Sequence, residues 1–141
     1  MCDMKAAVRL GVPDDLAFIM RKCHFTEEEV LRKIGENEIF LLTVDGQPAG
    51  YLSIEYLWSS IPFIDMLWIS EPYQKKGYSR DLLNFVEDYL REIGHETLYS
   101  SSQVDEAEPQ AWHRHMGFKD CGVINGINEG GIGEIFFRKP L

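Results

Sequence analysis

The first third of the chain combines one short apolar run with two stretches of helical spacing. The run Ala6–Leu10 predicts a strand, which Gly11 ends. Thr26 and Glu29 have the spacing of a capping box, so a short helix is expected to begin there. Before it, the pattern predicts another short helix whose inward stripe consists of Leu16, Ile19, Met20 and Cys23.

Three apolar runs in the middle of the chain predict a meander of antiparallel strands. The first is Ile39–Val44, and the pair Asp45-Gly46 that follows it favours a tight hairpin turn. The second strand is expected from about Ala49 to Trp58, and the third over Phe63–Ile69. Connections this short place consecutive strands side by side in one sheet.

The period of the pattern becomes helical after the third run. From Gly77 to Ile93 apolar residues recur every three or four positions, which predicts an amphipathic helix that Gly94 ends. A strand is expected from Thr97, and a strand–helix–strand unit of this kind has parallel strands. The remaining expected elements are a helix over Pro109–Met116, a strand near Cys121–Ile124 and a strand over Glu134–Arg138. Residues 1–141 therefore predict one α/β domain, with a mixed, mostly antiparallel sheet, a central parallel strand pair and flanking helices.

Composition and charge narrow the classes of function. The 141 residues include 14 Lys and Arg against 23 Asp and Glu, a net charge of −9, which disfavours a nucleic-acid binder and suits a cationic partner or substrate. The cysteines Cys2, Cys23 and Cys121 are far apart, so neither a zinc site nor a disulfide framework is expected. We find no secretory signal and no apolar segment of the roughly 20 residues that a membrane helix needs. A cytoplasmic protein without membrane contact or bound metal is expected.

The loop before the long helix carries the most chemistry. Gly77 lies where the loop meets the helix, and the unpaired N–H groups and dipole of a helix start attract anions. Lys75, Lys76 and Arg80 add positive charge in an otherwise acidic chain. The spacing matches neither a P-loop nor the dinucleotide fingerprint. The loop predicts a phosphate site, and the alternative is an ordinary basic helix start on the surface.

Two segments resemble a known family. Gln74-Lys75-Lys76-Gly77-Tyr78-Ser79 resembles the Gln/Arg-x-x-Gly-x-Gly/Ala signature of the GNAT superfamily of N-acetyltransferases, with Ser79 in place of the second Gly/Ala. Trp112–Phe118 resembles that family's aromatic-Tyr-x-x-Leu-Gly-Phe segment. The order of the elements also matches over essentially the whole chain. The resemblance implies the GNAT fold and an acetyl-CoA-dependent N-acyltransferase.

The resemblance also implies where acetyl-CoA binds. The residues expected to hold its pyrophosphate are Gln74, Lys75, Lys76, Gly77, Tyr78 and Ser79, with Arg80 adjacent. The end of the preceding strand, Leu67, Trp68 and Ile69, would supply the backbone N–H that polarises the thioester carbonyl. Such a donor matters because negative charge builds on that oxygen during attack.

Two side chains are candidate catalytic groups. His113 occupies the position of the family's frequent Tyr, which protonates the leaving CoA thiolate, and an imidazole with a pKa of about 6.5 can exchange protons at neutral pH. The alternative for His113 is a surface histidine. Asp65 lies inside an apolar strand, where family members that acylate polyamine-like or aminoglycoside substrates often carry an acid. The alternative for Asp65 is a side chain that faces solvent.

We therefore expect direct transfer of an acetyl group from acetyl-CoA to a primary amine of a small cationic acceptor, within a ternary complex. No metal and no covalent enzyme intermediate are required. A protein, peptide or amino-acid acceptor is an alternative within the family. The alternative from another class is a non-catalytic acyl-CoA-binding regulatory module, which the missing Tyr suggests. A homodimer stays open, since dimers are common among GNAT proteins.

Overall fold

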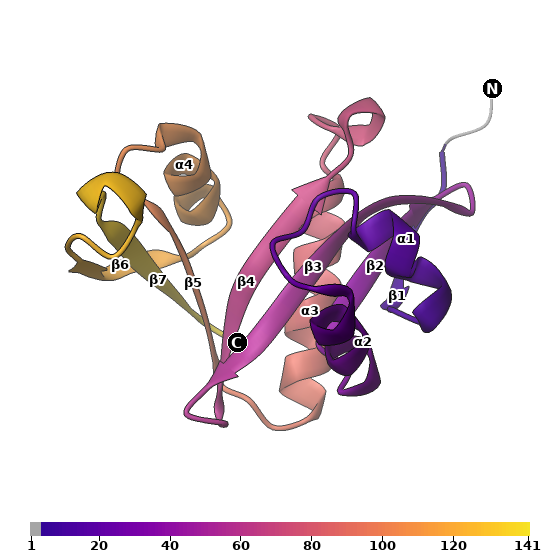
Figure 1. The fold of residues 1–141 in the computed structure, drawn as a ribbon, viewed down its shortest axis with the longest axis horizontal. Coiled ribbons are helices and arrows are strands. Elements are labelled where there is room, and N and C mark those ends of the chain that lie inside the picture. Colours follow the sequence, from indigo (N-terminus) through magenta and orange to yellow (C-terminus); the bar gives the residue numbers. More distant parts are fainter. Residues whose placement is uncertain (1–3) are drawn as a thin grey trace. The chain divides into compact units, whose positions relative to one another are not determined.

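The computed structural model describes residues 4–141 and has strands and helices in the predicted order (Figure 1). The strands are β1 Ala6–Leu10, β2 Ile39–Val44, β3 Gln47–Leu57, β4 Ile61–Ile69, β5 Thr97–Gln103, β6 Lys119–Ile124 and β7 Glu134–Pro140. The α-helices are α1 Leu16–Ile19, α2 Glu27–Gly35, α3 Tyr78–Glu92 and α4 Ala107–His115. Single 3₁₀ turns occupy Pro13–Asp15, Glu71–Tyr73 and Glu129–Gly131. Cys2 lies outside the described residues.

The strands form one seven-stranded sheet in the order β1-β2-β3-β4-β5-β7-β6. The pairs β1–β2, β2–β3, β5–β7 and β6–β7 are antiparallel, whereas β4 and β5 are parallel, with Phe63 opposite Tyr99. This confirms the predicted fold class, a mixed, mostly antiparallel sheet with one parallel strand pair. The parallel pair follows from α3, which carries the chain back so that β5 runs in the direction of β4.

The local predictions hold, with shifts of a few residues at the ends of most elements, but the helix expected to include Met20 and Cys23 ends at Ile19. The capping box is confirmed, because Thr26 Oγ1 accepts a hydrogen bond from the Glu29 N–H at 3.2 Å and the Glu29 carboxylate accepts one from the Thr26 N–H at 2.9 Å. The turn at Asp45-Gly46 is also confirmed, with φ of 50° and 79°. The last helix begins at Ala107, two residues earlier than predicted, since Pro109 is tolerated in a first turn.

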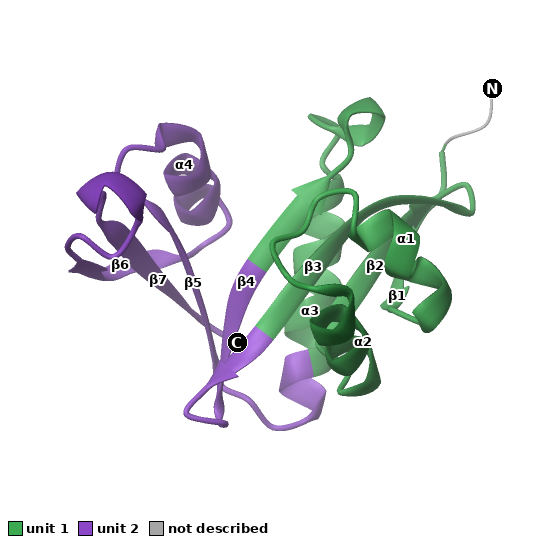
Figure 2. Ribbon diagram, in the orientation of Figure 1, with its two compact units in different colours: residues 1–54, 66–89 green, residues 55–65, 90–141 purple. Residues whose placement is uncertain are grey.

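The chain divides into two compact units (Figure 2), of which the first comprises residues 4–54 and 66–89. In this unit helices cover both faces of the sheet: α1 and α2 lie on one face and α3 on the other (Figure 1). The first face buries Ile39, Leu41 and Tyr51 against Ile19, Val30 and Ile34 of the two short helices. On the second face, the Phe40 ring lies 5.3 Å from the Tyr89 ring of α3. The alternating apolar positions of β2 therefore build two cores.

The second unit comprises residues 55–65 and 90–141. Its central strand β5 alternates in burial, and the buried side chains are Leu98, Ser100 and Ser102. Phe137 of β7 and His113 of α4 are also buried, whereas all residues of the outer strand β6 are exposed. The core of this unit therefore contains hydroxyl and imidazole groups beside its apolar side chains, and these need hydrogen-bond partners.

The structure also bears on membranes and metals. Within residues 4–141 no helix has the length and apolar character required to cross a bilayer. Over the same residues, no three or more His, Cys, Asp or Glu side chains gather in a group that could hold a metal ion.

Candidate active site

The two segments singled out by the sequence belong to different units and are described separately. The loop from Ser70 to Arg80 belongs to the first unit, and α4 with its neighbours to the second. Asp65 is the last β4 residue that belongs to the second unit, whereas Leu67, Trp68 and Ile69 belong to the first.

The loop after β4 closes back on the strand that leads into it. The Gln74 side-chain amide donates a hydrogen bond to the Ile69 carbonyl at 2.7 Å, and the Tyr73 N–H donates one to the Ser70 carbonyl at 2.9 Å. These bonds hold the segment between the end of β4 and the start of α3 in a compact turn. Gln74, a predicted cofactor contact, is the side chain that joins the loop to the strand end.

Gly77 precedes the first residue of α3 and has a backbone that other residues rarely adopt. Its φ is +85°, and a Cβ built on it would meet no atom within 4 Å. The first N–H groups of an α-helix have no partner within the helix. Lys75, Lys76 and Arg80 are exposed around this point, and Tyr78 and Ser79 are half-buried in the first turn. The loop therefore offers an anion open space, backbone donors and positive charge together, and these features fit a pyrophosphate.

The end of β4 is held tightly against β3. The Ser70 N–H donates to the Ala49 carbonyl at 2.9 Å. A Cβ on Gly50 would lie 2.6 Å from the Trp68 carbonyl oxygen and 2.8 Å from the Ile69 Cδ1, so only glycine allows this approach. Sequence reasoning missed Gly50, although a glycine inside a predicted strand is a known sign of close backbone approach. Gly50 thus positions the strand segment that includes Leu67, Trp68 and Ile69.

A cluster of aromatic rings and one arginine surrounds the Trp68 side chain. The Trp68 ring centroid lies 5.3 Å from that of Phe18 and 6.2 Å from that of Tyr51. The Arg21 guanidinium lies over both neighbouring rings, 5.4 Å from the Phe18 centroid and 5.5 Å from the Trp68 centroid. Phe18 and Arg21 are three residues apart at the end of a short helix, and this spacing is the sequence signal for their contact. No sequence pattern predicts the contact between Arg21 and Trp68.

His113 is buried, with 6% of its surface exposed, and both ring nitrogens have hydrogen-bond partners. Nε2 lies 2.7 Å from the Ser100 hydroxyl and Nδ1 lies 2.6 Å from the Pro109 carbonyl oxygen. The ring stacks on Phe137 with the centroids 4.4 Å apart and the planes 4° from parallel. His113 lies on the predicted helix, α4. The alternative that it is a surface histidine is wrong, because the ring is buried.

These contacts specify the protonation state of His113. Burial lowers the pKa of the imidazole below its usual value, and the hydrogen bond to the Pro109 carbonyl opposes this shift without reversing it. A carbonyl oxygen only accepts, so the proton of the neutral ring lies on Nδ1, and Nε2 accepts from the Ser100 hydroxyl. At neutral pH the ring is therefore uncharged, with its proton held by the backbone of its own helix.

Asp65 is half-buried on β4, and its Oδ1 atom is shielded from solvent. Side chains alternate along a strand, so Asp65 points to the opposite side of β4 from Met66, which packs on the core cluster of the first unit. The side chain as a whole is half-buried, so the alternative that Asp65 faces solvent across a half-exposed sheet stays open. A shielded carboxylate in an apolar strand is costly, which is why such a group commonly serves a site.

Comparisons with known proteins identify a family. Residues 13–118 match the model of the acetyltransferase (GNAT) family. An aminoglycoside N(6')-acetyltransferase type 1 of Stenotrophomonas maltophilia is 26% identical over 125 residues, which are 81% of this chain and 75% of that protein. A streptothricin acetyltransferase of Streptomyces lavendulae is 28% identical over 91 residues, 64% of this chain and 48% of that protein.

Solved structures share the fold at low sequence identity. Ard1 from Thermoplasma volcanium superposes with a TM-score of 0.85 at 14% identity, and covers 96% of this chain and 97% of its own. YncA from Salmonella typhimurium, solved with its cofactor acetyl-CoA, gives a TM-score of 0.80 at 16% identity, over 96% of this chain and 94% of its own.

The fold and the match over most of its length define an acetyltransferase, and the chain belongs to the GNAT acetyltransferase family. It is an acetyl-CoA-dependent N-acetyltransferase, which confirms the activity class, the family and the co-substrate expected from the sequence.

Proposed function

We propose that the chain transfers the acetyl group of acetyl-CoA to a primary amine of a small cationic acceptor, by direct attack within a ternary complex. The observation that carries this proposal is the loop after β4. There a glycine with φ of +85°, open space and exposed basic residues meet at the start of α3, and the Gln74 amide joins the loop to the end of β4. The hydrogen bond from Gln74 thus joins the proposed anion site to the strand end within the first unit.

The loop's proposed role is to bind the pyrophosphate. The backbone from Gln74 to Ser79 approaches the anion closely because Gly77 has no side chain, and the helix dipole and Arg80 add attraction. Acetyl-CoA supplies the thioester whose carbonyl carbon the amine attacks. The residues of this chain bind the cofactor, orient it and stabilise the charge that forms.

The end of β4 is the proposed donor to the thioester oxygen. A backbone N–H from the segment Leu67, Trp68 and Ile69 would bond the oxygen as it becomes negative, and losing one such donor costs about 3 kcal/mol of activation free energy. Gly50 supports this role, since it lets β3 hold the segment by direct backbone contact. A donor that is already fixed in place needs no reorganisation free energy during the reaction.

Asp65 is proposed to bind the acceptor ammonium and to assist its deprotonation. Its partly shielded carboxylate attracts a cation more strongly than a carboxylate in bulk water would, because the effective dielectric is lower. An amine attacks only in its neutral form, so a nearby base raises the fraction that can react.

His113 has two proposed roles with opposite consequences. Its position in the motif suggests the acid that protonates the CoA thiolate. Its surroundings favour a positioning role, because the neutral ring holds its one proton against the Pro109 carbonyl and accepts from Ser100. A positioning residue would hold α4 on β5 through Ser100, and the assay below distinguishes the two.

The choice of a cationic amine is supported by charge and by the relatives. The net charge of −9 attracts cations to the protein as a whole. The two curated relatives are named for an aminoglycoside N(6') position and for streptothricin. Amine transfer by this chain agrees with those names, while protein, peptide and amino-acid amines are the other acceptors within the family.

A thiol-release assay over a panel of amines tests the proposal. With acetyl-CoA present, at least one small primary amine should release CoA well above the hydrolysis background. Tight acetyl-CoA binding without turnover on any amine would instead identify a regulatory acyl-CoA-binding module.

His113→Phe and His113→Gln should then be compared with the parent. A lower kcat, together with loss of the fall in kcat at alkaline pH, indicates that His113 acts as an acid. A lowered melting temperature with an unchanged pH profile indicates a positioning role.

A further inference from the structure

We infer that the small cationic acceptor carries a carboxylate besides its amines, and that the Arg21 guanidinium binds this carboxylate, so that the acceptor is a basic amino acid or a similar amine. The inference deepens the proposed function and rests on it for acetyl transfer to an amine, but not for the role of Asp65, which points to the opposite side of β4 from the core cluster that Trp68 packs on. It comes from the placement of Arg21 beside Trp68, which lies in the β4 segment proposed to hold the thioester.

Aromatic contacts hold the Arg21 guanidinium without occupying its donors. The guanidinium lies 5.4 Å from the Phe18 ring centroid and 5.5 Å from the Trp68 centroid. A ring attracts the cation through its π electrons but offers no lone pair to the N–H groups. The planar fork of an arginine in such a contact can therefore still bind both oxygens of a carboxylate.

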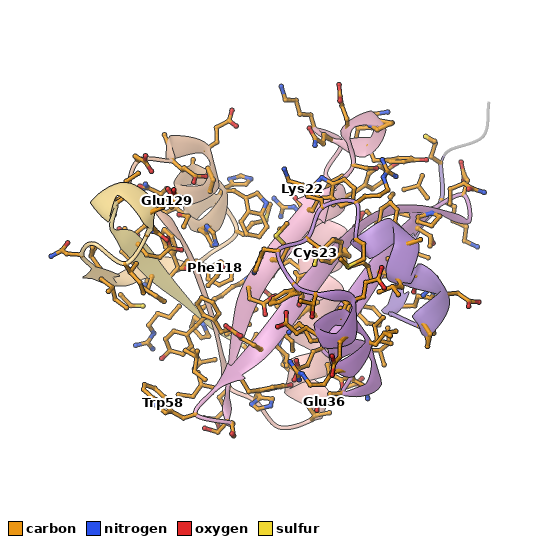
Figure 3. All side chains as sticks on the ribbon, in the orientation of Figure 1. Lys22, Cys23, Glu36, Trp58, Phe118 and Glu129 are labelled. Carbon is orange, nitrogen blue, oxygen red and sulfur yellow. The ribbon has the colours of Figure 1, made fainter. Side chains whose placement is uncertain are left out.

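The backbone that carries Arg21 is tied to the sheet. The Arg21 N–H donates to the Phe18 carbonyl at 3.1 Å, and the Lys22 N–H donates to the Ile19 carbonyl at 3.2 Å. The hydroxyl of the fully buried Tyr51 donates to the Lys22 carbonyl, so β3 anchors the residue next to Arg21. The segment with Lys22 and Cys23 lies over the face of the sheet that α1 and α2 cover (Figure 3). Arg21 is thus presented from a fixed turn.

Arg21 differs in charge pairing from three other arginines of this chain. Carboxylates outnumber basic residues by 23 to 14, and Arg9, Arg32 and Arg114 pair with Asp15, Glu36 and Asp120 respectively. Among residues 4–141, by contrast, no ion pair links Arg21 to a carboxylate of the chain. An exposed arginine stacked on two rings beside a proposed reaction centre has the character of a receptor for an external anion.

The same guanidinium could bind a phosphate of the cofactor instead, so the experiment separates the two anions. Steady-state thiol-release assays with the full chain use pairs of amines that differ only by the carboxylate: lysine and cadaverine, ornithine and putrescine, histidine and histamine. KM values for each amine and for acetyl-CoA are measured with the parent, with Arg21→Gln, and with Arg32→Gln. The last is the same change at an exposed arginine on α2.

The parent should show a lower KM for the carboxylate-bearing member of at least one pair. Arg21→Gln should raise that KM by about ten- to a hundredfold, the loss typical of one charge-assisted pair, with kcat, the KM of the decarboxylated amine and the KM of acetyl-CoA unchanged. Arg32→Gln should change none of these. A preference for the decarboxylated amines, an equal loss on both members of a pair, or a rise in the KM of acetyl-CoA alone would each overturn the inference.

If neither the carboxylate-bearing amines nor the decarboxylated amines are acetylated, the proposed function fails. The inference is then tested by measuring the binding of the amines to the protein. Calorimetry with the parent protein and CoA should show binding of the carboxylate-bearing amine of one pair, which Arg21→Gln abolishes. Absence of that binding in the parent overturns the inference as well.

Discussion

The loop around Gly77 and the helix around His113 are the two segments that carry the family resemblance, and the structure treats them differently. The loop is exposed, and the space beside Gly77 is open to a ligand. His113, in the second segment, is buried, stacked on Phe137 and bonded at both ring nitrogens. Both segments lie where the sequence predicts them, but the loop is exposed, whereas the His113 ring is enclosed by its neighbours.

The difference arises from the kind of group that each segment uses. An anion site made of backbone N–H groups depends on a glycine conformation and a helix start, and local sequence specifies both. An acid made of a side chain depends on its pKa, its tautomer and its access to solvent, and these are set by residues far away in the chain, here Ser100 and Phe137. A local sequence pattern is therefore a better guide to the conformation of the backbone than to the role of a side chain.

The largest expected effect is on the loop. Gly77→Asp should weaken acetyl-CoA binding by a hundredfold or more, because it adds a negative charge at the phosphate position and a side chain at φ of +85°. Calorimetry with acetyl-CoA measures the loss. The matched control is Gly46→Asp, since Gly46 has φ of +79° and equally open surroundings, but lies in the β2–β3 turn. Equal loss of binding in both variants would show that backbone strain, not the phosphate site, is responsible.

Asp65→Asn should have the next largest effect, and tests the one proposed charged group on β4 itself. The substitution keeps the size of the side chain and removes its charge and basicity, so kcat/KM for the amine should fall by about ten- to a hundredfold. The loss should shrink at high pH, where the free amine needs no base. A loss that is the same at every pH indicates a structural role for Asp65.

Residues that the sequence did not reveal are of a particular kind. The strands, the capping box, the hairpin turn and the loop are local features, and all were predictable to within a few residues. Gly50 and Arg21 matter because of what lies across from them, namely the Trp68 carbonyl and the Trp68 ring. Strand pairing depends on register, and stacking between elements depends on tertiary packing. Neither can be predicted from the local pattern of a single sequence.

Gly50→Ala tests whether the end of β4 needs its close contact with β3. The added Cβ would lie 2.6 Å from the Trp68 carbonyl oxygen, so the strands must separate there. We expect a loss of about 1–3 kcal/mol in the free energy of unfolding, measured in urea, and a fall in kcat below the melting temperature. Gly35→Ala is the control, because a Cβ there meets no atom within 4 Å. A stable and fully active Gly50→Ala variant would contradict the proposed positioning of the strand end.

The smallest expected effect is a pH dependence of stability caused by the buried imidazole of His113. Burial lowers the pKa of this imidazole in the folded protein, while in the unfolded chain its pKa is about 6.5. As the pH falls below about 6.5, the unfolded chain therefore binds a proton that the folded protein does not, and the free energy of unfolding decreases. The contribution of this group to stability is fully present at neutral pH and is lost on acidification, by at most about 1.4 kcal/mol per pH unit.

Urea unfolding of the parent and of His113→Gln between about pH 7 and pH 5 isolates this contribution, because the effects of the other titrating groups cancel in the difference between the two proteins. If the free energy of unfolding changes with pH in the same way in both proteins, His113 takes up a proton as readily in the folded protein as in the unfolded chain. The imidazole would then be able to act as an acid.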